Sequence, residues 1–266
     1  MEVRPLSPFG AEIHGVAVGA LDDPASVREA VSRARVAGFR GQDVNDRDFL
    51  LFLRQLGELM FTTGETAVDG EPDLNVVTNV GRTRKPRSVW HTDTSYVDAP
   101  PAFTALRAVE VPESGGETLF TDQVAVASTL PAWALDWLRG RTVRHAYGTE
   151  ELEEEEAWHP VLRQHPVTGE VAVYLSTPER CDRVSDTDDR MAKRVIELLY
   201  RRSTRASNVY RHRWQEGDVV IWDDRLTLHR ADHSNVVGDR TFHRGMVRGE
   251  TPTMAPNMAP TAAETA

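Results

Sequence analysis

Cysteine is nearly absent from this chain, because Cys181 is the only one among 266 residues. A single cysteine excludes both an internal disulfide and a thiolate metal cage, which favours a reducing compartment and predicts a cytoplasmic protein. Long apolar runs are also lacking, and residues 1–6 contain no apolar segment of the signal-peptide type. We therefore expect neither a membrane span nor a secretion signal.

Positive charge is scarce as well. Lysine and arginine together number 31 against 41 aspartates and glutamates, which gives a net charge of −10 at pH 7. Nucleic acids and anionic membranes repel such a protein, so neither is expected as a partner. The hydrophobic share of 40% is ordinary for a globular domain. The composition fits a soluble enzyme with a small-molecule substrate, either as a monomer or as a homo-oligomer.

Short apolar stretches separated by glycine and proline dominate the chain and predict a mainly β protein with flanking helices. One helix is expected to begin after Asp23 and a second after Asn45, because both residues are good N-caps. A third helix is expected at 186–202. The predicted fold class is a double-layered β-barrel or jelly roll. Strands are expected at 36–39, 74–77, 103–109, 210–214, 219–223 and 240–247.

Residues 1–250 are predicted to form a single domain. Residues 251–266 are rich in proline, alanine and threonine and are predicted to be a disordered tail. The block 150–156 is mostly acidic, which is typical of a solvated loop, and a lid over a neighbouring site is the alternative.

The candidate chemistry begins at His91 and Asp93, which stand two residues apart after an apolar residue. At the end of a strand, residues i and i+2 point to the same face and can grip one ion. His229 is the best candidate for a third ligand. Two histidines and one carboxylate on one face of an octahedron leave open positions, as in non-haem Fe(II) oxygenases.

Arg240 is a candidate for binding the carboxylate of a cosubstrate. Arg240 stands eleven residues after His229, and a chelating 2-oxo acid leaves its far carboxylate in need of a partner. An arginine suits that role because its planar fork binds a carboxylate through two hydrogen bonds. The Thr118 hydroxyl can donate a further hydrogen bond to the same carboxylate.

Several motifs in order resemble the taurine and chlorophenoxyacetate dioxygenase family of Fe(II)- and 2-oxoglutarate-dependent enzymes, over about residues 5 to 248. The matching segments are Trp90-His91-Thr92-Asp93, Gly115–Phe120, His159–Arg163, His165–Gly169, Tyr210–Trp214, Gly217–Asp223, Thr227–Ala231 and Arg240–Arg244.

This resemblance implies a double-stranded β-helix, a distorted jelly roll, that uses Fe(II), 2-oxoglutarate and O₂. It implies that His91, Asp93 and His229 bind iron. It also implies that Thr118 and Arg240 hold the 2-oxoglutarate tail.

Further residues are expected at the substrate. The resemblance places Arg244 near both cosubstrate and substrate, and we predict that it is the main anchor of a small organic anion. Arg87, in a basic cluster that is otherwise typical of a solvated loop, and Thr94 are further candidates for substrate contact. Taurine-using members carry a histidine for the sulfonate in the region of 61–64, and none stands there in this chain.

The expected reaction is hydroxylation of an unactivated C–H bond with release of succinate and CO₂. The same iron chemistry is compatible with desaturation or ring closure, and a metal- or ligand-binding jelly roll without turnover is a different class of alternative. His229 and His233 also have the spacing of a helical zinc pair, although their segment leaves a β-like run rather than a helix.

Overall fold

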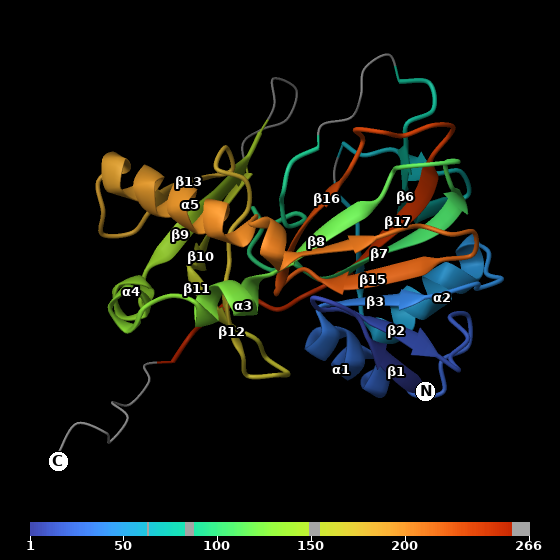
Figure 1. The fold of residues 1–266 in the computed structure, drawn as a ribbon, viewed down its shortest axis with the longest axis horizontal. Helices are drawn as coiled ribbons and strands as arrows, with labels where there is room; N and C mark the ends of the chain where they lie inside the picture. The colour runs from blue at the N-terminus through green and yellow to red at the C-terminus, as the bar shows by residue number, and fades with distance from the viewer. Residues whose placement is uncertain (63, 83–87, 149–154, 257–266) are drawn as a thin grey trace.

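Strands dominate the computed structural model, which describes residues 1–62, 64–82, 88–148 and 155–256 (Figure 1). The elements are β1 (Glu2–Pro5), β2 (Ala11–His14), α1 (Pro24–Ala34), β3 (Val36–Phe39), α2 (Asp46–Leu56), β4 (Leu59–Met60), β5 (Ala67–Val68), β6 (Glu71–Thr78), β7 (Pro101–Glu110), β8 (Thr118–Asp122), α3 (Gln123–Ser128), α4 (Ala132–Leu138), β9 (Thr142–Tyr147), β10 (Glu155–Pro160), β11 (Leu162–Gln164), β12 (Val171–Val173), β13 (Cys181–Val184), α5 (Asp189–Ser203), a 3-10 turn (Ala206–Asn208), β14 (Val209–His212), β15 (Val219–Asp223), β16 (Thr227–Ala231), β17 (Thr241–Arg248) and β18 (Thr253–Met254).

Two sheets pack face to face around the centre of the molecule. In the described residues the larger sheet has the order β1-β2-β3-β15-β7-β17-β6-β5, with β4 paired to β17, and the smaller has the order β14-β8-β16. Side chains from both sheets share one buried cluster. Within it, the Phe120 ring of β8 lies 5.3 Å from the Trp222 ring of β15. The two layers therefore meet through apolar inward-facing residues, as in a β-sandwich.

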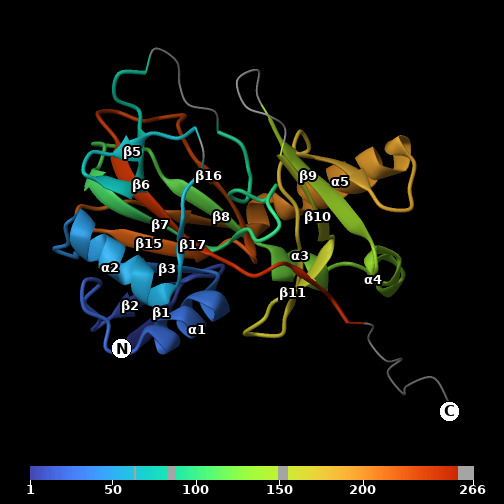
Figure 2. The ribbon, with the colours of Figure 1, turned by 180° about the vertical axis from the view of Figure 1, so that it is seen from behind.

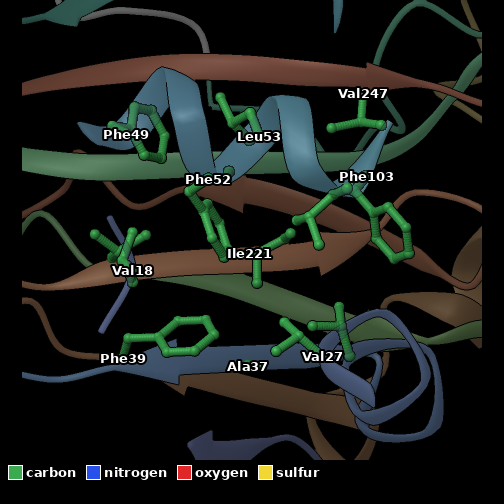
Figure 3. Packing of buried hydrophobic residues seen from close by; sticks show 14 of the residues in the cluster. Val18, Val27, Ala37, Phe39, Phe49, Phe52, Leu53, Phe103, Ile221 and Val247 are labelled. Carbon is green, nitrogen blue, oxygen red and sulfur yellow. The ribbon is translucent and has the colours of Figure 1, made fainter. Parts of the chain in front are cut away.

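Helices α1 and α2 cover the other face of the large sheet (Figures 1 and 3). The Asn45 side chain caps α2 by accepting from the Asp48 N–H at 3.0 Å. Figure 3 shows Phe49, Phe52 and Leu53 of this helix turned toward the strands, and all three are fully buried. Burial of each such side chain contributes about 1.5–3 kcal/mol, so this layer anchors the sheet that carries the site.

A third group of elements lies beside the sandwich (Figure 2). It contains the small sheets β10-β9-β13 and β12-β11-β18, and a second apolar cluster joins them to α3, α4 and α5. The sequence did not suggest β9 or β13. These two strands matter because they pair with each other and place the residues before β13 next to Tyr147 of β9.

The helices and strands predicted from the sequence are confirmed with small shifts of their ends; α5, for example, begins at Asp189 rather than 186. The predicted disordered tail is wrong over its first residues, because β18 pairs with β11 and Ala255 is buried. Residues 257–266 and most of the acidic block 150–156 lie outside the described residues, as does Arg87. The single domain over 1–250 stays a prediction.

Across the described part of the chain, no helix combines the length and the apolar character needed to cross a membrane.

Candidate active site

A buried turn between β15 and β16 sets the position of the first candidate ligand, His229. Asp223 ends β15, and its carboxylate accepts from the Arg225 Nε at 2.8 Å and from Nη2 at 2.6 Å. Ser32 Oγ and His165 Nε2 lie 2.8 and 3.0 Å from the same carboxylate. Burial alone raises the pKa of Asp223, but the Arg225 guanidinium holds that pKa well below its usual range. The turn is thus fixed by a buried charge pair.

His91 and His229 are partners across an isolated antiparallel bridge. The His91 N–H donates to the His229 carbonyl at 3.0 Å, and the His229 N–H donates to the His91 carbonyl at 2.8 Å. Their rings lie 4.3 Å apart, centroid to centroid. The main chain therefore fixes the two imidazoles side by side, although 91 and 229 are far apart in sequence.

Asp93 joins these rings through a turn rather than through the strand end that its spacing suggested. Thr92 Oγ1 donates to the Asp224 carbonyl at 2.9 Å, which holds the turn against the β15–β16 connection. Thr94 has a φ of 38°, a conformation that a β-branched residue rarely adopts, so the backbone here is strained. The i, i+2 spacing of His91 and Asp93 predicts their proximity correctly, but they lie on a turn and not at the end of a strand.

The three side chains offer a set of donors suited to a cation. One ligand atom from each of His91, Asp93 and His229 lies within 4.8 Å of the others. His91 Nδ1 lies 2.9 Å from the Val89 carbonyl, so it carries the proton and leaves the Nε2 lone pair for a metal. That Nε2 is 3.5 Å from Asp93 Oδ1, and His229 Nε2 is 3.7 Å from Asp93 Oδ2.

The charges at this cluster support the same reading. Burial lowers the pKa of His229 to about 3, so its imidazole is neutral and able to bind a metal. Burial raises the pKa of Asp93, but the positive charge of Arg244 holds that pKa well below its usual range. Two imidazoles and one carboxylate fit a divalent transition metal of the non-haem iron type.

A buried hydroxyl orients Asp93 from behind. Thr104 Oγ1 lies 3.0 Å from Asp93 Oδ2 and 2.6 Å from Asp224 Oδ2. Burial and the Asp93 charge raise the pKa of Asp224 well above its ordinary value. A hydroxyl has one proton and cannot donate to both carboxyls, and its raised pKa makes Asp224 the carboxyl of the two that more readily carries a proton of its own. Trp222 Nε1 donates to Asp224 Oδ1 at 3.1 Å and completes this support.

Arg240 lies in the core of the sandwich with 1% of its surface exposed. Its Nε donates to the Gly116 carbonyl at 3.0 Å, and its guanidinium carbon lies 4.1 Å from the centre of the Phe242 ring. Among the described residues no carboxylate forms an ion pair with it, and burial lowers its pKa to about 10.. A buried cation without a counter-ion is costly, so this position is built to receive an anion.

Thr118 belongs to the same wall. Its Oγ1 accepts a hydrogen bond from Trp214 Nε1 at 3.0 Å, which leaves the hydroxyl proton free for another acceptor. The Trp214 ring in turn lies 4.4 Å from the Phe242 ring, on which Arg240 rests. The sequence-predicted pair is therefore connected through two packed aromatic rings.

Arg244 lies on β17, four residues beyond Arg240, and reaches the metal side of the site. Its Nη1 is 3.5 Å from Asp93 Oδ1, and its Nη2 forms a close ion pair with Glu65. Two carboxylates thus already offset its charge. Glu65 was not among the residues predicted from the sequence.

A cavity of about 120 Å³ opens beside these residues. It is lined by Thr62, Gly64, Glu65, His91, Asp93, Thr94, Tyr96, Tyr147, Arg180 and Arg244. The structure therefore brings the predicted residues His91, Asp93, Thr94 and Arg244 to one cavity. Sequence reasoning missed Tyr96, Tyr147 and Arg180, which no motif or spacing distinguishes.

Comparison with known proteins gives a consistent result. Residues 2–246 match the family model described as taurine catabolism dioxygenase TauD, TfdA family. An α-ketoglutarate-dependent sulfate ester dioxygenase of Pseudomonas putida is 31% identical over 95% of this chain and 91% of its own length. The pentalenolactone F synthase of Streptomyces arenae is 32% identical over 86% of this chain and 89% of its own length.

A solved structure agrees with these relatives. A taurine dioxygenase from Burkholderia xenovorans superposes with a TM-score of 0.84 at 32% identity and covers 95% of this chain and 92% of its own. The predicted jelly roll, mainly β with flanking helices, is confirmed by this likeness.

Proposed function

Because the chain belongs to the TauD/TfdA family and is an Fe(II)- and 2-oxoglutarate-dependent dioxygenase, we propose that His91, Asp93 and His229 are its iron ligands. The observation that carries this proposal is the convergence of one ligand atom from each residue within 4.8 Å. The predicted cofactors, Fe(II), 2-oxoglutarate and O₂, are confirmed by the family and its relatives. The alternative of a binding protein without turnover is thereby set aside.

Each residue has a task in the reaction. Iron bound here couples oxidative decarboxylation of 2-oxoglutarate by O₂ to attack on a C–H bond of the substrate. His91 and His229 would bind the metal through imidazole nitrogens, and Asp93 would supply a negative charge that Thr104 keeps oriented. Purified protein should consume O₂ and form succinate only when Fe(II) and 2-oxoglutarate are both present.

We propose that Arg240 and Thr118 hold the distal carboxylate of 2-oxoglutarate. The buried guanidinium of Arg240 has no carboxylate partner in the described structure, and an incoming carboxylate would neutralise it. Gly116 is part of the same cradle, because a Cβ at this position would lie 3.1 Å from Arg240 Cδ. Glycine at position 116 therefore avoids a close contact with the Arg240 side chain.

Replacement of this arginine gives a prediction with two readouts. Arg240→Gln should raise the 2-oxoglutarate concentration needed for half-maximal succinate formation by roughly 30-fold or more, since a buried charge pair of about 2–5 kcal/mol is lost. In the absence of 2-oxoglutarate the variant should melt no earlier than the parent, because an unpaired buried charge has been removed. If the dependence on 2-oxoglutarate is unchanged, Arg244 and not Arg240 binds the distal carboxylate.

We propose that the substrate is a small organic anion. Relatives of this chain are named for sulfate esters, sulfonates and 2,4-dichlorophenoxyacetate. Arg244 contacts the proposed metal ligand Asp93 and lines the same cavity, so we assign it to the boundary between cosubstrate and substrate. Thr94 lines the same cavity, and Arg87 is retained as a substrate contact outside the described residues.

A second outcome of the same chemistry is favoured by one relative, whose name is that of a synthase. Desaturation or ring closure would remove two hydrogen atoms from the substrate, whereas hydroxylation adds one oxygen atom. Mass spectrometry of the product, once a substrate is found, separates these reactions. We take hydroxylation as the main function because most of the named relatives are dioxygenases.

We also propose that the protein works in the cytoplasm. Cys181 supports this location, because it is the single cysteine of the chain and so leaves the protein without an internal disulfide.

A further inference from the structure

Arg180 stands just before β13 and places its guanidinium over two tyrosine rings. The guanidinium carbon lies 4.7 Å from the centre of the Tyr147 ring and 5.7 Å from that of Tyr96. The two rings are themselves stacked, 5.0 Å apart and inclined by 23°. All three residues line the cavity beside His91 and Asp93.

The charge of Arg180 distinguishes it from the other arginine of this cavity. Arg244 is paired with Asp93 and Glu65. The guanidinium of Arg180, by contrast, forms no ion pair and no hydrogen bond with another described residue. Its contacts with Tyr96 and Tyr147 use the faces of those rings. The N–H groups of a guanidinium lie in its plane and form a fork that suits a carboxylate or a sulfonate.

We propose that Arg180, supported by Tyr96 and Tyr147, binds the anionic group of the substrate. This inference rests on the proposed function, since it places the substrate in the cavity beside the candidate iron ligands. It also revises the expectation that Arg244 is the main anchor, because Arg244 already has two acidic partners. Arg180 is thereby the specificity-determining cation of the site.

The surroundings of Arg180 agree with an anion and exclude a bulky one. Burial raises the pKa of Tyr96 to about 12, so its phenol stays neutral and does not repel a negative group. The cavity of about 120 Å³ has room on the order of four water molecules. A compact sulfonate, sulfate or carboxylate head fits this space, with the remainder of the substrate toward the opening.

The test compares anionic probes with a neutral probe of nearly the same shape as one of them. Propane-1-sulfonate and methyl propyl sulfone have nearly the same shape, but the sulfone is neutral; butanoate and propyl sulfate complete the set of anions. Binding to the parent enzyme, loaded with Fe(II) and 2-oxoglutarate without O₂, is measured by calorimetry. We expect at least one anion to bind more tightly than the sulfone, and the preferred head group identifies the class.

The variants then assign that preference to one side chain. Arg180→Gln should weaken binding of the preferred anion by about 10- to 100-fold, as for a lost charge-assisted pair, and leave the affinity for the sulfone nearly unchanged. Arg180→Lys should recover only part of the affinity, since lysine keeps the charge without the fork. Arg183→Gln, on the exposed part of β13, is the matched control and should bind all probes like the parent.

Two results would overturn the proposal. The parent would bind no anion more tightly than the sulfone, or Arg180→Gln would bind the preferred anion as the parent does. Melting temperature and iron content of each variant show that the fold and the metal site are retained. Failure of the proposed function would look different, because in a separate assay with Fe(II), 2-oxoglutarate and O₂ the parent would then form no succinate.

Discussion

His229→Ala abolishes turnover in our expectation, with a loss of more than about 100-fold. Substitution of groups that merely orient a metal ligand costs about 10–100-fold, so loss of a ligand itself costs more. Iron binding should weaken in parallel, and iron content after dialysis measures it directly. The fold should persist, because the His91–His229 bridge uses main-chain atoms that alanine retains.

The matched control is His233→Ala. His233 stands four residues beyond His229, where a helical zinc pair would need it, but His229 lies on strand β16. We therefore expect the control variant to keep its iron and its succinate formation. Loss of metal in both variants, or in His233→Ala alone, would contradict the assignment of the ligands.

Asp223→Ala should lower the free energy of unfolding by about 3–5 kcal/mol, since it leaves the Arg225 guanidinium buried beside a missing partner. The Arg225 side chain is 2% exposed, and among the described residues it would keep one carboxylate partner, Glu250 at 3.3 Å, besides the Ser32 hydroxyl at 3.3 Å. Urea unfolding monitored by tryptophan fluorescence gives this value. Activity should fall as well, because the same turn leads into the strand of His229.

A surface pair provides the comparison for this variant. Asp182 forms hydrogen bonds to Arg144 at 2.9 and 2.8 Å, but its side chain is 42% exposed. Asp182→Ala should therefore lower the free energy of unfolding by only about 0–1 kcal/mol.

Acid gives a second check on the contribution of Asp223. Because the pKa of Asp223 is depressed from its ordinary value of 3.8, its stabilisation is complete above that value and is lost as the pH falls below it. The difference in stability between the parent and Asp223→Ala should therefore shrink progressively as the pH falls below 3.8.

The convergence of the candidate ligands was predictable from sequence because their chemistry is distinctive. His91 and Asp93 stand out by residue type and spacing, and His229 follows the short, mainly apolar run at 226–228. The conformation that joins them was not predictable. A turn held by Thr92 and Asp224 performs the task that a strand end was expected to perform, and only tertiary hydrogen bonds select it.

The substrate side of the site was less accessible to such reasoning. Arg180 stands in an irregular segment, and its neighbours Tyr96 and Tyr147 come from two other parts of the chain. Their meeting depends on β9 and β13, which are short strands of mixed polarity without a clear alternating pattern. Residues that act through long-range packing carry no signature of their own.

The bridge between His91 and His229 has a consequence for how the enzyme comes to hold its metal. A contact between residues so distant in sequence costs loop entropy that the other native contacts must offset, so the bridge belongs to the folded protein. The candidate iron site is therefore complete only in the folded protein. Iron should in turn slow hydrogen exchange at the two amides of the bridge, since bound metal opposes its local opening. The metal would thus stabilise the folded protein, because only the folded protein brings the candidate ligands together.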